Sequence, residues 1–286
     1  MRWLVSLGIS LCLIILFSSW GFYAHRMINE AAVFTLPVPL AGFYKKHIIY
    51  ISEHAVDADK RRYVNSEEAE RHFIDIDAYG ENPFDSIPPY WQDAIDKIPE
   101  ETLRANGILP WQIHFSYIQL VNAFKERNTQ RILRISTDIG HYIADAHSPL
   151  HTTKNYNGQL TDQYGIHAFW ESRLPEIYAS SYNFYVGKAQ YIDAPLLKAW
   201  EIIQHSFSLT DSVLLIEKRL NQEFPDDKKY IFENRNNILI KSYSQPYSKA
   251  YHQALNGMIE KQMRAAIITL SSFWYSAWID AGQPKL

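Results

Sequence analysis

Residues 129–151 read TQRILRISTDIGHYIADAHSPLH and combine a strong helix signal with a dense group of residue types that bind metals. Apolar residues recur at helical spacing as far as Ala146, and Pro149 predicts that the helix ends nearby. His141 and Asp145 are four residues apart, so a helix places both on one face. His151 follows just beyond the predicted end, from where it can turn back toward that face.

A second pair of the same kind follows, with His167 and Glu171 again four residues apart. The residues between them are Ala-Phe-Trp, which predicts a partly buried face, where a carboxylate without a partner would be costly. Imidazole and carboxylate groups are ligands that suit zinc. The two pairs, with His151 between them, therefore predict a metal site. We expect His147 to pack or to support a ligand rather than to bind metal.

Helical spacing of apolar residues extends over most of the chain. We expect helices over residues 25–36, 40–55, 111–127, 129–146, 164–174, 195–224 and 251–280, with a break near Ser208. We find no run of six or more residues that alternates convincingly, as a half-buried strand would. A chain of 286 residues, 47% of them hydrophobic, is long enough for a substantial core. The sequence therefore predicts an all-α, single-domain helical bundle.

The first nineteen residues have the pattern of a secretory signal peptide: Met1-Arg2, an apolar run to Phe17, and then Ser18-Ser19. We expect cleavage after Ser19, with an uncleaved N-terminal membrane anchor as the alternative. Cys12, the only cysteine, lies in this segment, so the mature chain would bind metal through His, Asp, Glu or backbone groups. Export without disulfides fits a bacterial periplasm or the cell exterior.

The spacing of these residues resembles the signature of one superfamily: His141-x3-Asp145-x-His147-x-Pro-Leu-His151, followed by His167-x3-Glu171. That superfamily contains the single-strand-specific zinc nucleases of fungi and plants (the S-one/P-one type) and the bacterial zinc-dependent phospholipases C. Three upstream segments extend the resemblance: Trp20-Gly21 followed by His25, Ala58-Asp59-Lys60-Arg61-Arg62, and His72-Phe73-Ile74-Asp75. The resemblance covers over half of the chain and implies that residues 20–286 form one catalytic domain.

This resemblance implies an all-α domain with three zinc ions in a cleft. It assigns Asp59, His72, His141 and Asp145 to one ion. It assigns Trp20, through its free amine and carbonyl, and His25 to a close neighbour that Asp145 bridges. His151, His167 and Glu171 would bind the third ion.

The catalytic candidates are Asp59, Arg62 and Asp145. Two close zinc ions can share a hydroxide that attacks phosphorus, and Arg62 is a candidate clamp on the phosphate. Asp75 is a candidate for orienting His72 or a neighbouring ligand.

The substrate is open between the two branches. Lys60 stands where choline-binding phospholipases carry an aromatic residue, and it suits a phosphate backbone, whereas Glu171 favours the phospholipase because the nucleases usually have Asp there. A net charge of −3 argues against a broad basic nucleic-acid surface but not against a nuclease, because bound metal ions bring positive charge. We expect an exported zinc-dependent endonuclease or 3'-nucleotidase that acts as a monomer on single-stranded nucleic acid or nucleotides. A phospholipase C acting on phospholipid is the alternative.

A helical zinc-binding protein without catalysis is the alternative from another class. Structural zinc sites are closed by four protein ligands, usually including cysteine. Nine ligand positions for three metals leave coordination sites open, which favours an enzyme.

Overall fold

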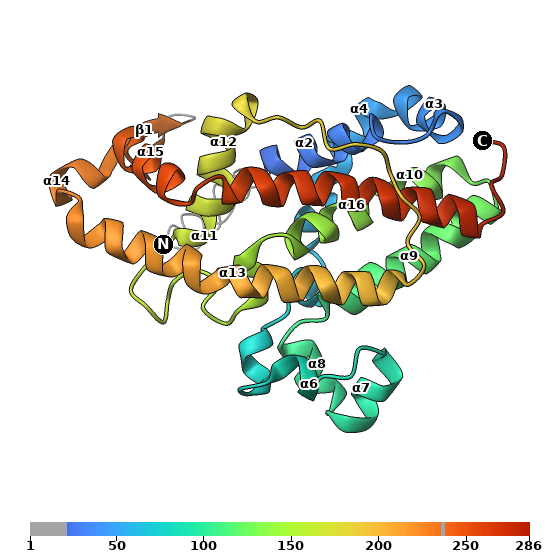
Figure 1. The fold of residues 1–286 in the computed structure, drawn as a ribbon, viewed down its shortest axis with the longest axis horizontal. Coiled ribbons are helices and arrows are strands. Elements are labelled where there is room, and N and C mark those ends of the chain that lie inside the picture. The colour runs from blue at the N-terminus through green and yellow to red at the C-terminus, as the bar shows by residue number, and fades with distance from the viewer. Residues whose placement is uncertain (1–21, 236–237) are drawn as a thin grey trace, which may run out of the picture.

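Five helices pack side by side around a shared apolar core (Figure 1). They are α2 (Phe22–Val33), α9 (Leu109–Lys125), α10 (Thr129–Ala146), α13 (Pro195–Glu223) and α16 (Met258–Asp280). The structure is a computed structural model that describes residues 22–235 and 238–286. The predicted signal peptide and Trp20 lie outside the described residues. The prediction of an all-α fold is confirmed, since one two-stranded hairpin is the only sheet in the described ranges.

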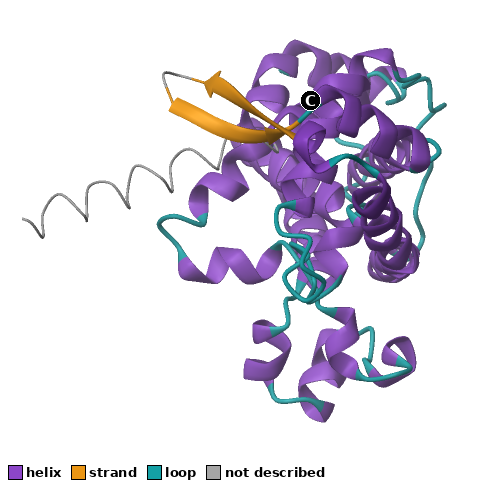
Figure 2. Cartoon of the chain, turned by 90° about the vertical axis from the view of Figure 1, so that its left-hand side faces the viewer, coloured by secondary structure: helices purple, strands orange, loops and turns teal. Residues whose placement is uncertain are grey.

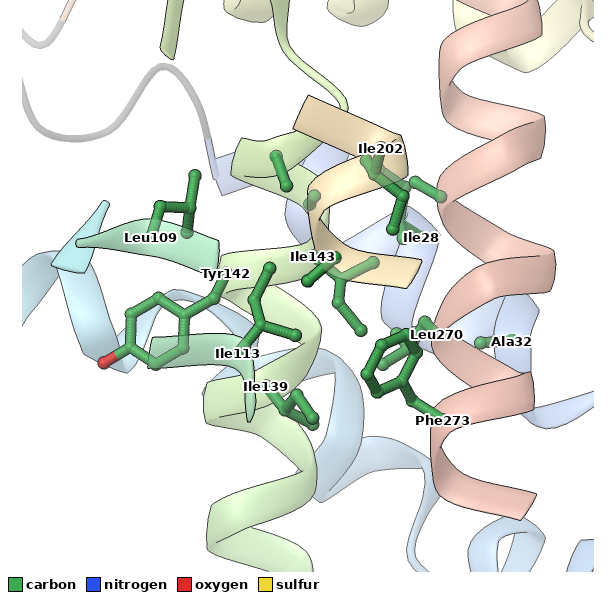
Figure 3. Packing of buried hydrophobic residues seen from close by; sticks show 14 of the residues in the cluster. Ile28, Ala32, Leu109, Ile113, Ile139, Tyr142, Ile143, Ile202, Leu270 and Phe273 are labelled. Atoms are coloured by element: carbon green, nitrogen blue, oxygen red, sulfur yellow. The ribbon is translucent and has the colours of Figure 1, made fainter. Parts of the chain in front are cut away.

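Helix α10 runs through the middle of this bundle and is buried along most of its length. Its first turn is capped by Asn128, whose side chain accepts a hydrogen bond from the Arg131 amide. Figure 3 shows Ile139 and Ile143 of α10 between the helices, with Leu270 and Phe273 of α16 facing them. Burial of this apolar face holds the His141 and Asp145 positions deep inside the molecule.

Short elements connect and cover the bundle. Helices α6, α7 and α8 form a lobe that projects from one side of it (Figures 1 and 2). The remaining elements are α3 (Val38–Lys46), α4 (Ile48–Glu53), η1 (His54–Val56), α5 (Asp57–Arg61), η2 (Ser66–Arg71), η3 (Ile76–Tyr79), α6 (Pro83–Ser86), α7 (Trp91–Lys97), α8 (Glu100–Ala105), η4 (Pro149–Thr152), α11 (Ile166–Ala168), η5 (Phe169–Arg173), α12 (Leu174–Tyr178), η6 (Ala179–Ser181), α14 (Asp226–Lys229), β1 (Tyr230–Arg235), β2 (Ile238–Tyr243) and α15 (Gln245–Ala254).

Several predicted helix boundaries are wrong. The segment 40–55 is divided into α3, α4 and η1, whereas α13 runs without the expected break near Ser208. The helix predicted to stop at Pro175 continues to Tyr178, because Pro175 lies in the first turn of α12 and a proline there costs no hydrogen bond. The segment 251–280 is interrupted after α15, where Asn256 and Gly257 adopt a left-handed backbone conformation.

The antiparallel hairpin β1–β2 is an element that the sequence pattern did not predict. Its strands pair in register from Tyr230 opposite Tyr243. Phe232 and Leu239 on the hairpin are 69% and 68% exposed, so the sheet lacks the regular alternation of buried apolar and exposed polar residues that identifies a strand.

Within the part of the chain that the structure describes, no helix combines the length and the apolar character needed to cross a bilayer.

Candidate metal centre

The eight side chains predicted as metal ligands lie together in the structure. They come from six separate stretches of the chain, so the tertiary fold is needed to bring all eight to one place. Three groups have ligand atoms within 4.8 Å of one another and could each hold a metal ion: His25, His141 and Asp145; Asp59, His72 and His141; His151, His167 and Glu171. The ninth predicted ligand, Trp20, lies outside the described residues.

Asp145 presents its two carboxylate oxygens to different histidines. Oδ2 lies 2.9 Å from Nδ1 of His72 and 3.4 Å from Nε2 of His141. Oδ1 lies 3.4 Å from Nε2 of His25 and 3.8 Å from Nε2 of His151. A carboxylate oriented in this way can bridge two neighbouring cations.

Glu171 connects the third group to the rest of the cluster. Its Oε2 atom lies 2.9 Å from Nε2 of both His151 and His167, and its Oε1 atom lies 3.4 Å from Nε2 of His25. Glu171 sits in η5, which is a π-helix. A π-helical turn changes the direction in which side chains leave a helix, and such turns are frequent at functional sites.

Backbone carbonyls orient three of the histidines. The Nδ1 atoms of His141, His151 and His167 face the carbonyl oxygens of Ala55, His72 and Tyr156 at 2.9, 2.6 and 3.2 Å. If each Nδ1–H donates to its carbonyl, Nε2 carries a free lone pair toward the cluster. This is the arrangement that fixes the tautomer and the ring orientation of metal-binding histidines.

The electrostatics of the cluster favour the ligand forms of its acids. Burial raises the pKa of Asp145, but His141 and His151 outweigh this effect and hold that pKa well below its usual range. Burial also raises the pKa of Glu171. The neighbouring His151 and His167 outweigh this effect and hold that pKa well below its usual value. Burial lowers the pKa of His141 to about 4, against the attraction of Asp145. Ionised carboxylates and neutral imidazoles are the forms that bind a cation. Burial lowers the pKa of His151, but Asp145 and Glu171 outweigh this effect and raise it to about 9, so a cation bound there would have to displace a proton.

Access to the cluster is uneven. His25, His72, His141 and Asp145 are at most 3% exposed, whereas Asp59 and His167 are about a quarter exposed. Arg62 lies on the open side, with Nη1 3.5 Å from Oδ1 of Asp59. A molecule that reaches the cluster beside Asp59 would therefore meet the Arg62 guanidinium as well.

Two residues near the predicted ligands take different places in the structure. His147 is buried with its Nδ1 atom 2.7 Å from the Ile143 carbonyl, and it belongs to none of the three groups, as expected. Glu68, which no sequence pattern marks as part of the site, lies 3.7 Å from Nε2 of His72. Glu68, and not Asp75, is thus the carboxylate nearest to Nε2 of His72.

No model of a known protein family matches this chain, and a search of curated proteins finds no similar sequence.

Proposed function

We propose that this chain is an exported zinc-dependent phosphodiester hydrolase, a nuclease or 3'-nucleotidase that acts on single-stranded nucleic acid or nucleotides. The observation that carries the proposal is the orientation of Asp145, whose two oxygens face separate groups of histidines. A buried side chain placed in this way suits a cluster of cations better than a single structural ion.

The donor set fits zinc. Each of the three groups offers three nitrogen or oxygen ligands, although two groups share His141, whose one free nitrogen can bind a single ion. Zinc prefers four ligands in tetrahedral geometry. Three protein ligands and one open position are typical of catalytic zinc sites, whereas structural sites are closed. Zinc bound here would supply a water of lowered pKa and would polarise a phosphoryl oxygen.

The side chains have separate roles in this proposal. Asp59 and Asp145 hold the cations and neutralise part of their charge. Arg62 binds a non-bridging phosphate oxygen and aligns the phosphodiester beside Asp59. The backbone of Trp20 would complete the cluster once the signal peptide is removed, so a residue added before Trp20 should impair turnover.

One structural observation favours phospholipase C as the second candidate. The hairpin β1–β2 exposes the apolar side chains of Phe232 and Leu239. Exposed apolar residues on a projecting element can enter the surface of a lipid layer.

A substrate panel on the mature chain, residues 20–286, tests the proposal. It contains single-stranded DNA, RNA, a 3'-nucleotide, phosphatidylcholine and bis(p-nitrophenyl) phosphate, and zinc content is measured on the same preparation. We expect cleavage of the nucleic acids, loss of cleavage with a chelator, and recovery with added zinc. Cleavage of phosphatidylcholine alone would support the second candidate. Bound zinc without turnover of any substrate would identify a zinc-binding protein without catalysis.

A further inference from the structure

We propose that Glu68 is a positioning residue of the metal centre, whose buried carboxylate accepts the Nε2–H of His72 and directs Nδ1 of His72 to the metal. The proposal rests on the proposed metal-dependent function and adds a residue that lies outside the predicted ligand set.

The orientation of His72 is the first observation. Its Nδ1 atom faces the cluster, 2.9 Å from Oδ2 of Asp145 and 3.0 Å from Nε2 of His141. Its Nε2 atom is buried and has no hydrogen-bond partner within normal distance. The nearest carboxylate to that nitrogen is Glu68, with Oε1 at 3.7 Å. A shift of less than about 1 Å would make this a hydrogen bond.

His72 differs from three of its neighbours in this respect. His141, His151 and His167 turn Nδ1 to a backbone carbonyl and Nε2 to the cluster, whereas His72 turns Nδ1 to the cluster. A metal bound at Nδ1 leaves the proton of His72 on Nε2, where an acceptor is needed because a buried N–H without one is costly. Glu68 is the group that the fold provides on that side.

The environment of Glu68 shows that its charge is held in place. The residue is 0% exposed, yet its carboxylate is surrounded by donors: Tyr142 Oη at 2.5 Å, Arg71 Nη1 at 3.0 Å and Arg61 Nη2 at 3.2 Å. Figure 3 shows Tyr142, a member of the buried cluster, leaving α10 on the side away from α16.

A carboxylate in this position has effects on His72 beyond accepting a hydrogen bond from it. It fixes the tautomer and the orientation of the ring, and it makes the metal-binding nitrogen more basic. Loss of such a partner weakens metal binding about 10–100-fold in other histidine sites. Because His72 belongs to one of the three groups, the effect should fall on one ion.

Metal affinity of the mature protein tests this role, with Glu68→Gln against Glu67→Gln as a matched control. Glu67 is the neighbouring acid, is 74% exposed, and lies 3.9 Å from Arg71. Titration with zinc in competition with a chelator should show one ion bound about 10–100-fold more weakly in E68Q and no change in E67Q. Unchanged affinity for every ion in a folded E68Q would overturn the proposal.

A measurement on the unaltered protein covers the case in which E68Q does not fold. The ring nitrogens of zinc-loaded protein are observed by ¹⁵N NMR, and the His72 signals are identified by their absence in His72→Ala. We expect zinc at Nδ1 and a slowly exchanging proton on Nε2. Zinc at Nε2 of His72, in a protein that binds zinc and cleaves phosphodiesters, would refute the role of Glu68 but leave the proposed function standing. A protein that binds no zinc at all would refute the proposed function together with it.

Discussion

The Oδ2 atom of Asp145 lies 2.9 Å from the Nδ1 atom of His72, although 73 positions separate the two residues in the sequence. Both side chains are almost completely buried. Asp145 also turns its other oxygen to His25 at 3.4 Å. One carboxylate therefore links two groups of histidines that the chain supplies from distant segments.

Replacing Asp145 by Asn should remove more than one ion. An amide carries no charge and presents only one oxygen, so it cannot bridge two cations. We expect zinc content, measured by mass spectrometry, to fall from three ions to one, held by His151, His167 and Glu171. Phosphodiesterase activity should fall at least about 100-fold. Asp211→Asn, on the exposed surface of α13, is the control and should change neither quantity. Three ions retained in D145N would contradict the bridging role.

Replacing Arg62 by Ala should lower turnover without changing zinc content. Arg62 is 47% exposed and contacts the proposed ligand Asp59 without being a ligand itself. Removal of one donor to a developing charge commonly costs about 100–1000-fold in kcat, and we expect about 10–100-fold here because Arg62 is half exposed. Arg62→Lys keeps the charge but loses the bidentate geometry, so the activity of R62K should lie between those of the wild type and R62A. Steady-state kinetics with a nucleotide substrate measure kcat for the three proteins. A wild-type kcat in R62A would show that Arg62 has no role in turnover.

Local periodicity made part of this structure predictable. The helix containing His141 and Asp145 has a strong 3.6-residue pattern, so both the all-α class and the shared face of these two residues follow from sequence. The convergence of all eight side chains rested on resemblance to a family, because no local pattern relates His25 to Glu171. The structure places them together, and metal binding itself stays a prediction.

Other features depend on contacts that sequence spacing does not encode. Glu68 looks like one of several acids in a charged segment, and its burial arises from Arg61 and Tyr142, which approach only in the fold. The interruption between α15 and α16 did have a signal, because Asn256-Gly257 is a pair that favours left-handed backbone. Apolar residues on both sides of that pair concealed it.

Gly140→Ala should destabilise the protein and disturb the cluster. A Cβ atom at Gly140 would overlap the amide of buried Asn29, whose Nδ2 donates to the His25 carbonyl at 2.9 Å. We expect a loss of about 1–3 kcal/mol in the free energy of unfolding, because the site has no room for a methyl group. Gly42→Ala, at an open position of α3, should instead stabilise by up to about 1 kcal/mol. Urea unfolding of the two variants separates these outcomes, and a stabilised G140A would mean that Asn29 moves aside freely.

Asp75→Asn should stabilise the protein at neutral pH. Burial, and then repulsion from Asp77, raise the pKa of Asp75 from 3.8 to about 6. Because this folded-state pKa lies above the unfolded value, the folded state holds the proton more tightly. The resulting contribution to stability is fully present below about pH 4 and is lost as the pH rises through 6. The shift corresponds to about 3 kcal/mol, which we reduce to about 1 kcal/mol because the side chain is only partly buried.

The difference in the free energy of unfolding between D75N and the wild type is measured by urea unfolding at pH 4 and pH 8. A chelator is present throughout, so that metal content is constant. We expect equal stability at pH 4 and a gain of about 1 kcal/mol for D75N at pH 8. Asp211→Asn, on the exposed surface of α13, is the control and should change stability equally little at both pH values. A gain that is the same at both pH values would show that the amide improves packing and that the charge of Asp75 is not the cause.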